Sequence, residues 1–127
     1  MKKENDLSKY IGLAGPSYEV DIERGKIREF AKAMYAPIPD FCEGKTPIIP
    51  ATFFVSVPYT WGYSLERPRG TVFSSVEHDF SIPLHAEESF IFHHGLPKAG
   101  DTFRVRSTIE NISEKQGRRG GLLTFFT

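Results

Sequence analysis

The chain has 127 residues, the size of one domain, with sixteen basic and sixteen acidic side chains and a formal net charge of zero. The balanced charge argues against nucleic-acid binding, which usually needs a basic excess. No run of about 18 apolar residues indicates a membrane span, and no apolar segment behind the N-terminus indicates a secretory signal. The lone Cys42 excludes an internal disulfide and a cysteine-based zinc cluster. We therefore expect one cytoplasmic domain over residues 1–127.

The N-terminal third predicts an arm, a strand and a helix. Residues 1–10 are polar and are expected to form a flexible arm, and the alternation in 17–20 predicts a short strand. Asp21 is suited to cap a helix over about 22–35. The apolar stripe of that helix recurs at i, i+3, i+4 and i+7, in Ile27, Phe30, Ala31 and Met34.

Prolines and glycines divide the middle of the chain. Pro37 and Pro39 are expected to stop the helix, which leaves 36–50 as a loop. The apolar segment 51–59 has a length that permits either a short helix or a buried strand. Residues 60–83 are irregular in pattern and are interpreted as a flap.

The C-terminal third predicts a meander of strands. In 88–94, Phe90 and Phe92 point to one side. A turn over 96–101 leads into 102–112, whose apolar residues alternate as in a half-buried antiparallel strand. A hairpin connection over 116–121 leads into a strand over 122–126. That apolar strand ends the sequence and leaves an unpaired edge. Three explanations stay open: a partner covers the edge, another chain completes the sheet, or the sequence is shortened.

An early helix followed by an antiparallel meander is an α+β pattern. Five segments in this order resemble the MaoC-like dehydratase family, in its FAS1-like, N-terminal branch. These segments are 27–33, 50–53, 84–90, 97–102 and 114–125. The resemblance covers about 10–127 and implies a hot dog fold, an antiparallel sheet wrapped around one long helix, here lacking its last strand.

The resemblance also locates the expected catalytic loop and shows how this chain departs from it. Catalytic relatives carry an Asp, an Asn-Pro pair and a His two residues beyond the Pro, just after the helix. Here Pro39 is kept, but Ala36 stands at the Asp position and Phe41 at the His position. Neither side chain can exchange a proton. Asp40 lies beside them, where the family has no catalytic group, and is interpreted first as a solvated turn residue.

The resemblance therefore implies a subunit of an (R)-specific enoyl thioester hydratase or 3-hydroxyacyl thioester dehydratase, without catalytic groups of its own. The substrate is an acyl thioester carried by coenzyme A or by a carrier protein, and no other cofactor is implied. The expected partner is a second hot dog subunit that carries Asp and His. Assembly as a homodimer or as a heterodimer is left open. Two alternatives stay open: an active homodimer that uses His85 or Asp40 as a substitute acid or base, and a module that binds acyl thioesters without chemistry.

Further candidate residues are weighed against plainer interpretations. Tyr59 and Trp61 are candidates to line the acyl channel, although core packing is the plainer interpretation. Arg118 and Arg119 are candidates to bind phosphate, since guanidinium forks suit phosphate oxygens, although a solvated hairpin tip is the plainer one. The adjacent His93 and His94 point to opposite faces of a strand, so no metal site is expected.

Overall fold

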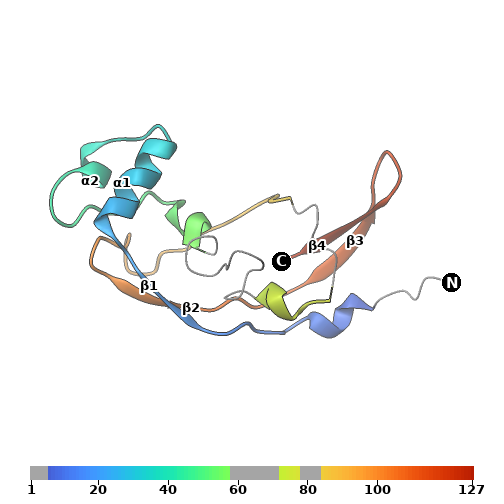
Figure 1. The fold of residues 1–127 in the computed structure, drawn as a ribbon. Coiled ribbons are helices and arrows are strands. Elements are labelled where there is room, and N and C mark those ends of the chain that lie inside the picture. The colour runs from blue at the N-terminus through green and yellow to red at the C-terminus, as the bar shows by residue number, and fades with distance from the viewer. Residues whose placement is uncertain (1–5, 58–71, 78–83) are drawn as a thin grey trace.

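The computed structural model describes residues 6–57, 72–77 and 84–127 of the chain (Figure 1). The helical elements are η1 (Leu7–Tyr10), α1 (Arg24–Ala33), α2 (Pro39–Cys42), η2 (Phe53–Ser56) and η4 (Val72–Ser75). The strands are β1 (Tyr18–Asp21), β2 (Thr102–Val105), β3 (Ile112–Gln116) and β4 (Leu122–Phe126). The architecture is α+β with antiparallel pairing, as the sequence pattern predicts.

Residues 7–10 form a helical turn with a buried side, so the flexible arm expected over residues 1–10 is wrong for its described part, 6–10. η1 is a 3₁₀ turn whose Leu7 and Tyr10 are buried. Residues three apart lie on the same side of such a turn, so both side chains reach the core together. The Asp6 carboxylate caps it by accepting hydrogen bonds from the Ser8 hydroxyl and amide, and these bonds lower the pKa of Asp6.

A long antiparallel ribbon joins the two ends of the chain. β1 pairs with β2 from Tyr18 opposite Val105 to Asp21 opposite Thr102, which confirms a strand near the expected 17–20. The pairing continues beyond these strands, because the Gly15 amide donates to the Ser107 carbonyl at 2.8 Å. The expected single strand over 102–112 is divided instead into β2 and the start of β3.

The alternation predicted for that segment is nevertheless present in its burial. Phe103, Val105 and Ser107 are half-buried and Ile109 is buried, while the intervening residues are exposed. The period-2 pattern thus reports the facing of side chains correctly across the break between the strands.

The helix α1 begins later than expected. Asp21 is the last residue of β1, and its carboxylate accepts a hydrogen bond from the Thr102 hydroxyl at 2.7 Å. Glu23 occupies the N-cap position and makes no side-chain capping bond. The expected cap at Asp21 is therefore wrong, because the strand pairing uses that carboxylate. The apolar stripe does face the core, since Ile27 and Ala31 are fully buried.

The end of α1 is set by a Schellman motif rather than by the prolines that follow. The Ala36 amide donates to the Ala31 carbonyl at 2.9 Å, and the Tyr35 amide donates to the Lys32 carbonyl at 3.1 Å. Tyr35 takes the left-handed conformation with φ of 54°, which this motif needs at its position. Met34, the last member of the expected stripe, is exposed at this end.

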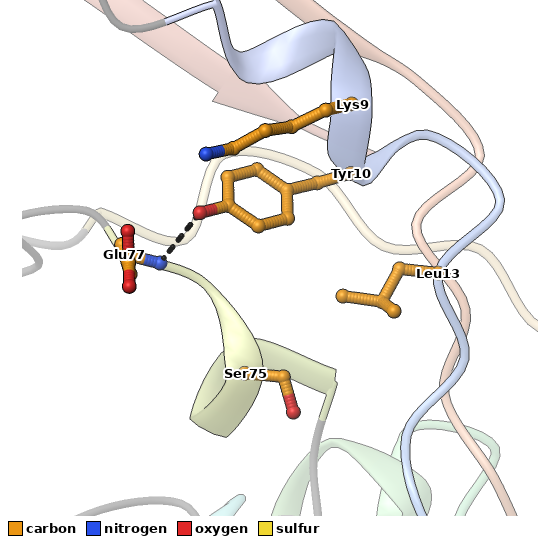
Figure 2. Close-up of a pocket in the computed structure, with 5 residues that line it drawn as sticks. All are labelled: Lys9, Tyr10, Leu13, Ser75 and Glu77. Carbon is orange, nitrogen blue, oxygen red and sulfur yellow. Dashed lines mark hydrogen bonds between the residues drawn. The ribbon is translucent and has the colours of Figure 1, made fainter.

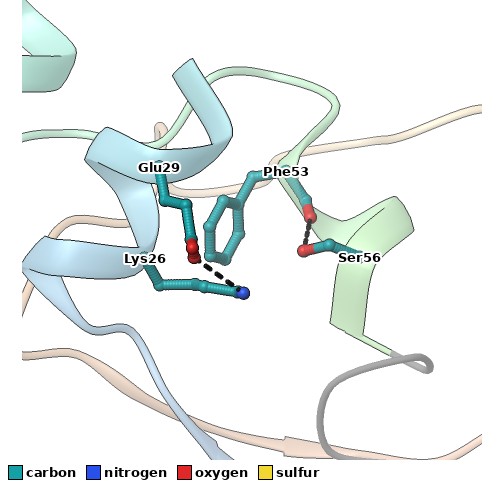
Figure 3. A network of polar contacts seen from close by, with 4 residues as sticks. All are labelled: Lys26, Glu29, Phe53 and Ser56. Atoms are coloured by element: carbon teal, nitrogen blue, oxygen red, sulfur yellow. Dashed lines mark hydrogen bonds and ion pairs between the residues drawn. The ribbon is translucent and has the colours of Figure 1, made fainter. Parts of the chain in front are cut away.

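Phe53 is the centre of the larger of two core clusters. Its fully buried ring packs edge-on against Phe30 at 5.5 Å between ring centroids, and Figure 3 shows it directed toward α1. The segment 51–59 thus contains a helical turn, η2, in its described part, which settles the alternative left open by its length. The Ser56 hydroxyl donates to the Phe53 carbonyl at 2.8 Å, and on the surface of α1 Lys26 pairs with Glu29 at 2.9 Å (Figure 3).

A second core cluster lies under the hairpin at the other end of the ribbon. Its buried members are Leu7, Tyr10, Val72, Val76 and Ile109. β3 and β4 pair from Ile112 opposite Phe126 to Gln116 opposite Leu122, as the hairpin signal predicts. Ile112 and Phe126 pack onto this cluster, so one face of the hairpin covers it.

The strand expected over 88–94 does not form. Residues 84–92 belong to no strand, and they make no hydrogen bond to a backbone group of the described residues. Phe90 and Phe92 still lie on the same side, with their rings stacked at 6.3 Å between centroids, while Ile91 is exposed. The alternation thus predicts correctly that Phe90 and Phe92 face the same side. A strand also needs a neighbouring segment with which its backbone can form hydrogen bonds.

The described strands form two separate two-stranded sheets. Figure 1 shows α1 and α2 at one end of the molecule, near the β1–β2 ribbon, and the β3–β4 hairpin at the opposite end. The single sheet wrapped around the helix, as the hot dog fold would have it, is not seen in the described residues.

Candidate functional site

The loop that follows α1 is positioned by the Schellman motif. The hydrogen bond from the Ala36 amide to the end of α1 fixes the backbone of Ala36 relative to the helix. The Ala36 side chain is half-buried. Pro39 then begins α2, where its fixed φ suits a first helical residue and its missing N–H costs nothing. The loop is thus held at both ends by backbone geometry.

Arg28 fastens this loop to α1. Its Nε donates to the Cys42 carbonyl at 2.7 Å, and its Nη2 lies 3.5 Å from the Gly44 carbonyl. A guanidinium can serve two acceptors at once because its donors form a rigid fork. The Arg28 side chain therefore ties residues 42–44 to the helix that precedes the loop.

The loop residues themselves offer little proton chemistry. Phe41 is half-buried and packs on the larger core cluster, so its ring supports the loop from beneath. The Asp40 side chain is exposed in the first turn of α2, while its backbone carbonyl accepts a hydrogen bond from the Ile48 amide at 3.1 Å. Of Ala36, Asp40 and Phe41, only Asp40 can ionise, and it faces solvent.

His85 has a carboxylate partner that sequence reasoning did not foresee. Its Nε2 lies 3.1 Å from Oε2 of Glu88, and the two side chains are 58% and 33% exposed. A histidine oriented by a carboxylate is an arrangement that can transfer protons. The pair lies on the extended segment 84–92, outside the α1–α2 loop.

The other candidates do not gather around the loop. Arg118 and Arg119 are exposed at the tip of the β3–β4 hairpin, which Figure 1 shows at the far end of the molecule from α2. Tyr59 and Trp61 lie outside the described residues. Among the described residues, no group of three His, Cys, Asp or Glu side chains lies close enough together to hold a metal ion.

A cavity of about 400 Å³ opens elsewhere, between η1 and η4 (Figure 2). Lys9, Tyr10, Leu13, Ser75 and Glu77 line it. The Lys9 ammonium lies 4.8 Å from the Tyr10 ring centroid, and the Tyr10 hydroxyl accepts a hydrogen bond from the Glu77 amide at 3.1 Å. No motif in the sequence pointed to it, because two groups of residues 62 or more positions apart build it.

The comparison with protein families decides the relationship that the loop suggests. The family model described as the FAS1-like, dehydratase domain region matches residues 10–127. The chain belongs to this family of dehydratase domains. No curated protein and no solved structure matches it.

Membership confirms the expected relationship to the MaoC-like and FAS1-like dehydratases of hot dog fold. It supports a function of the hydratase or dehydratase type. No helix in the described part of the chain has the length and apolar character needed to cross a bilayer.

Proposed function

We propose that this chain is the non-catalytic half of an (R)-specific enoyl thioester hydratase, or of a 3-hydroxyacyl thioester dehydratase. A second hot dog subunit, different from this chain, would supply the Asp and the His, because an identical copy carries the same Ala36 and Phe41. The observation that carries the proposal is the α1–α2 loop, where Ala36 and Phe41 stand at the two proton-handling positions and the Phe41 ring packs on the core.

The chemistry explains why these two substitutions matter. Dehydration removes a proton from C2 and the hydroxyl from C3, and the hydroxyl leaves as water after it takes up a proton. A base must accept the first proton and an acid must deliver the second. The developing oxyanion of the thioester also needs hydrogen-bond donors. A methyl group and a half-buried phenyl ring supply neither proton step.

A row of aromatic rings supports a role for this chain in shaping an acyl site. The half-buried ring of Phe54 lies 6.2 Å from Phe92 and 5.6 Å from Phe103, and Phe92 in turn stacks with Phe90. The row leads from the buried Phe53 to the surface segment 84–92. These rings would form an apolar wall, the kind of surface that suits the hydrocarbon part of a ligand. Coenzyme A or a carrier protein would hold the thioester, and no other cofactor is required.

The test compares the chain alone with the chain in complex. We expect the purified chain to show no hydration of crotonyl-CoA, and the complex recovered with its partner from native cells to show turnover to the (R)-3-hydroxy product. In that complex, Asp40→Asn is expected to leave kcat/KM within about twofold, because the Asp40 side chain faces solvent and stabilises no transition state. A tenfold loss would require about 1.4 kcal/mol of such stabilisation. Turnover by the isolated chain would refute the proposal.

A second candidate function rests on the His85–Glu88 pair. If His85 is a substitute acid or base, the chain is active without a different partner. His85→Ala would then abolish turnover and Glu88→Gln would lower it, since the carboxylate orients the imidazole. A chain that is inactive alone, in a complex that tolerates His85→Ala, removes this candidate.

A module that binds acyl thioesters without chemistry remains as a third outcome of the same experiments. Saturable thermal stabilisation by acyl-CoA, with no turnover in any complex, would favour it, because a ligand that binds only the folded state raises the melting temperature.

A further inference from the structure

The outer face of the β3–β4 hairpin is apolar and basic at once. Lys115, Leu123 and Phe125 share this face, opposite the one that covers the second core cluster. Leu123 is 53% exposed and Phe125 is 38% exposed. The Lys115 ammonium lies 5.4 Å from the Phe125 ring centroid. Arg118 and Arg119 follow at the tip.

The positive charge of the hairpin is unbalanced locally. Residues 112–126 contain three cationic side chains and one acidic one, in a chain whose total charge is zero. Among the described residues, none forms an ion pair with Lys115, Arg118 or Arg119. The acidic member, Glu114, points to the other face, where its carboxylate lies 3.5 Å from the Thr124 hydroxyl. An acidic and apolar surface would complement this one.

The same chain carries such a surface on the segment 84–92. Glu87 and Glu88 lie there, together with Leu84 and Ile91, which are 89% and 78% exposed. The segment is extended and its backbone groups bond to no backbone group of the described residues. It is anchored through Phe92 to the larger core cluster, whereas the hairpin is anchored to the second cluster.

The charges of the two surfaces are opposite in sign, and both surfaces carry exposed apolar groups. Glu87 forms no ion pair among the described residues, so its carboxylate is open to an arginine of the hairpin tip of a second molecule. Glu88 already pairs with His85 at 3.1 Å and would share that carboxylate in the contact. Ile91 lies on the same side of the extended segment as Glu87 and would meet the exposed Leu123.

We propose that the hairpin face of one copy of this chain docks on segment 84–92 of a second copy, and that a two-fold axis makes the contact twice in a closed dimer. Such an axis satisfies both surfaces on both copies. The contact uses neither the α1–α2 loop nor Asp40, so it goes beyond the proposed reaction and leaves that loop free for a catalytic partner.

The test uses two charge-reversal variants and their mixture. The hairpin variant Lys115→Glu/Arg118→Glu/Arg119→Glu and the segment variant Glu87→Lys/Glu88→Lys each place like charges in both contacts of a dimer. We expect each variant to raise the dimer dissociation constant at least about tenfold in sedimentation experiments. Mixed together, the two variants have opposite charges in both contacts, and we expect a heterodimer with affinity near that of the natural chain.

A matched control separates the contact from overall charge. The variant Arg24→Glu/Lys45→Glu/Lys98→Glu makes the same change in net charge at exposed positions of other elements. It is expected to dimerise normally and to show no preference for the segment variant.

Three results would overturn the proposal. One is a natural chain that stays monomeric at about 100 μM, where a functional dimer should assemble. Another is a pair of variants that dimerise as the natural chain does. The third is a mixture that fails to restore the dimer, which would point to a different acidic protein as the occupant of the hairpin face.

Discussion

Tyr35 carries a backbone conformation that glycine usually supplies. It is the one residue other than glycine with a positive φ among those the structure describes, and its side chain is 95% exposed. The left-handed conformation costs an L-residue roughly 1–2 kcal/mol. The side chain makes little packing contact that could offset this cost, so the strain is borne by the fold as a whole.

We therefore expect Tyr35→Gly to stabilise the protein by about 1 kcal/mol, because glycine adopts this conformation without the Cβ penalty. Urea denaturation of the two proteins measures the difference. Tyr35→Ala serves as the control, since it removes the same ring but keeps a Cβ, and it should bring no such gain. Equal stability of the glycine and alanine variants would contradict the role given to the backbone.

Single residues also mark where sequence reasoning stopped. No glycine stands at the end of α1, so the usual signal of a Schellman motif is absent and the sequence predicts a stop at the prolines beyond it. Asp21 is a good capping residue by type, but its carboxylate is engaged with Thr102, 81 residues away. The exchange of Ala36 and Phe41 into the catalytic loop, by contrast, could be found from the order of residues alone.

At the scale of elements, Arg28 links α1 to the loop that defines the candidate site. The contact could not be read from the sequence, because it joins a side chain to two carbonyl groups 14 and 16 residues away. Backbone carbonyls carry no sequence signature. Arg28 therefore holds the loop, although an arginine on a helix is usually expected to lie on its solvent-exposed face.

The variant Arg28→Lys keeps the charge but loses the fork, and we expect it to lower the free energy of unfolding by about 1 kcal/mol. It should also speed hydrogen exchange at the Ile48 amide, which bonds to the Asp40 carbonyl within the same loop. Arg24→Lys is the matched control, since Arg24 is exposed on the first turn of the same helix. If Arg28→Lys changes neither quantity, the loop is held by the Schellman motif and α2 alone.

Elements differ in how well their patterns predicted them. The alternation over 103–109 gave the correct facing because those residues have β1 and the segment before it as a neighbour. The same alternation over 88–94 gave the correct facing of Phe90 and Phe92 but not a strand. Period-2 patterning reports which side chains are buried, while hydrogen-bonded pairing depends on a second segment that the local sequence does not contain.

At the scale of the molecule, two core clusters share one ribbon. Ile109 belongs to the second cluster and is 1% exposed, and its amide donates to the Leu13 carbonyl at 3.0 Å. The same ribbon reaches the first cluster through Val20 and Ile22. The clusters should therefore lose their structure together when the ribbon opens.

We expect Ile109→Ala to cost about 2–5 kcal/mol of stability, the range for truncating a fully buried isoleucine. Because the ribbon is shared, exchange should quicken at the Ile22 amide in the first cluster as well as in the second. The control is Ile11→Ala, which removes the same atoms at a position that is 45% exposed and should change stability by no more than about 0.5 kcal/mol. Loss of protection confined to the second cluster would show that the two clusters unfold independently.

The ribbon also sets an order of events during synthesis. Asp21 leaves the ribosome long before Thr102, because the two partners of their hydrogen bond are 81 positions apart. At about 5–20 residues per second, that interval lasts roughly 4–16 s. Throughout it, the first strand has no pairing partner, and α1 has only its contacts with residues up to Val57 to hold it. The nascent chain is then most exposed to chaperones and to wrong pairings, and a pause in translation before residue 102 would prolong that exposure.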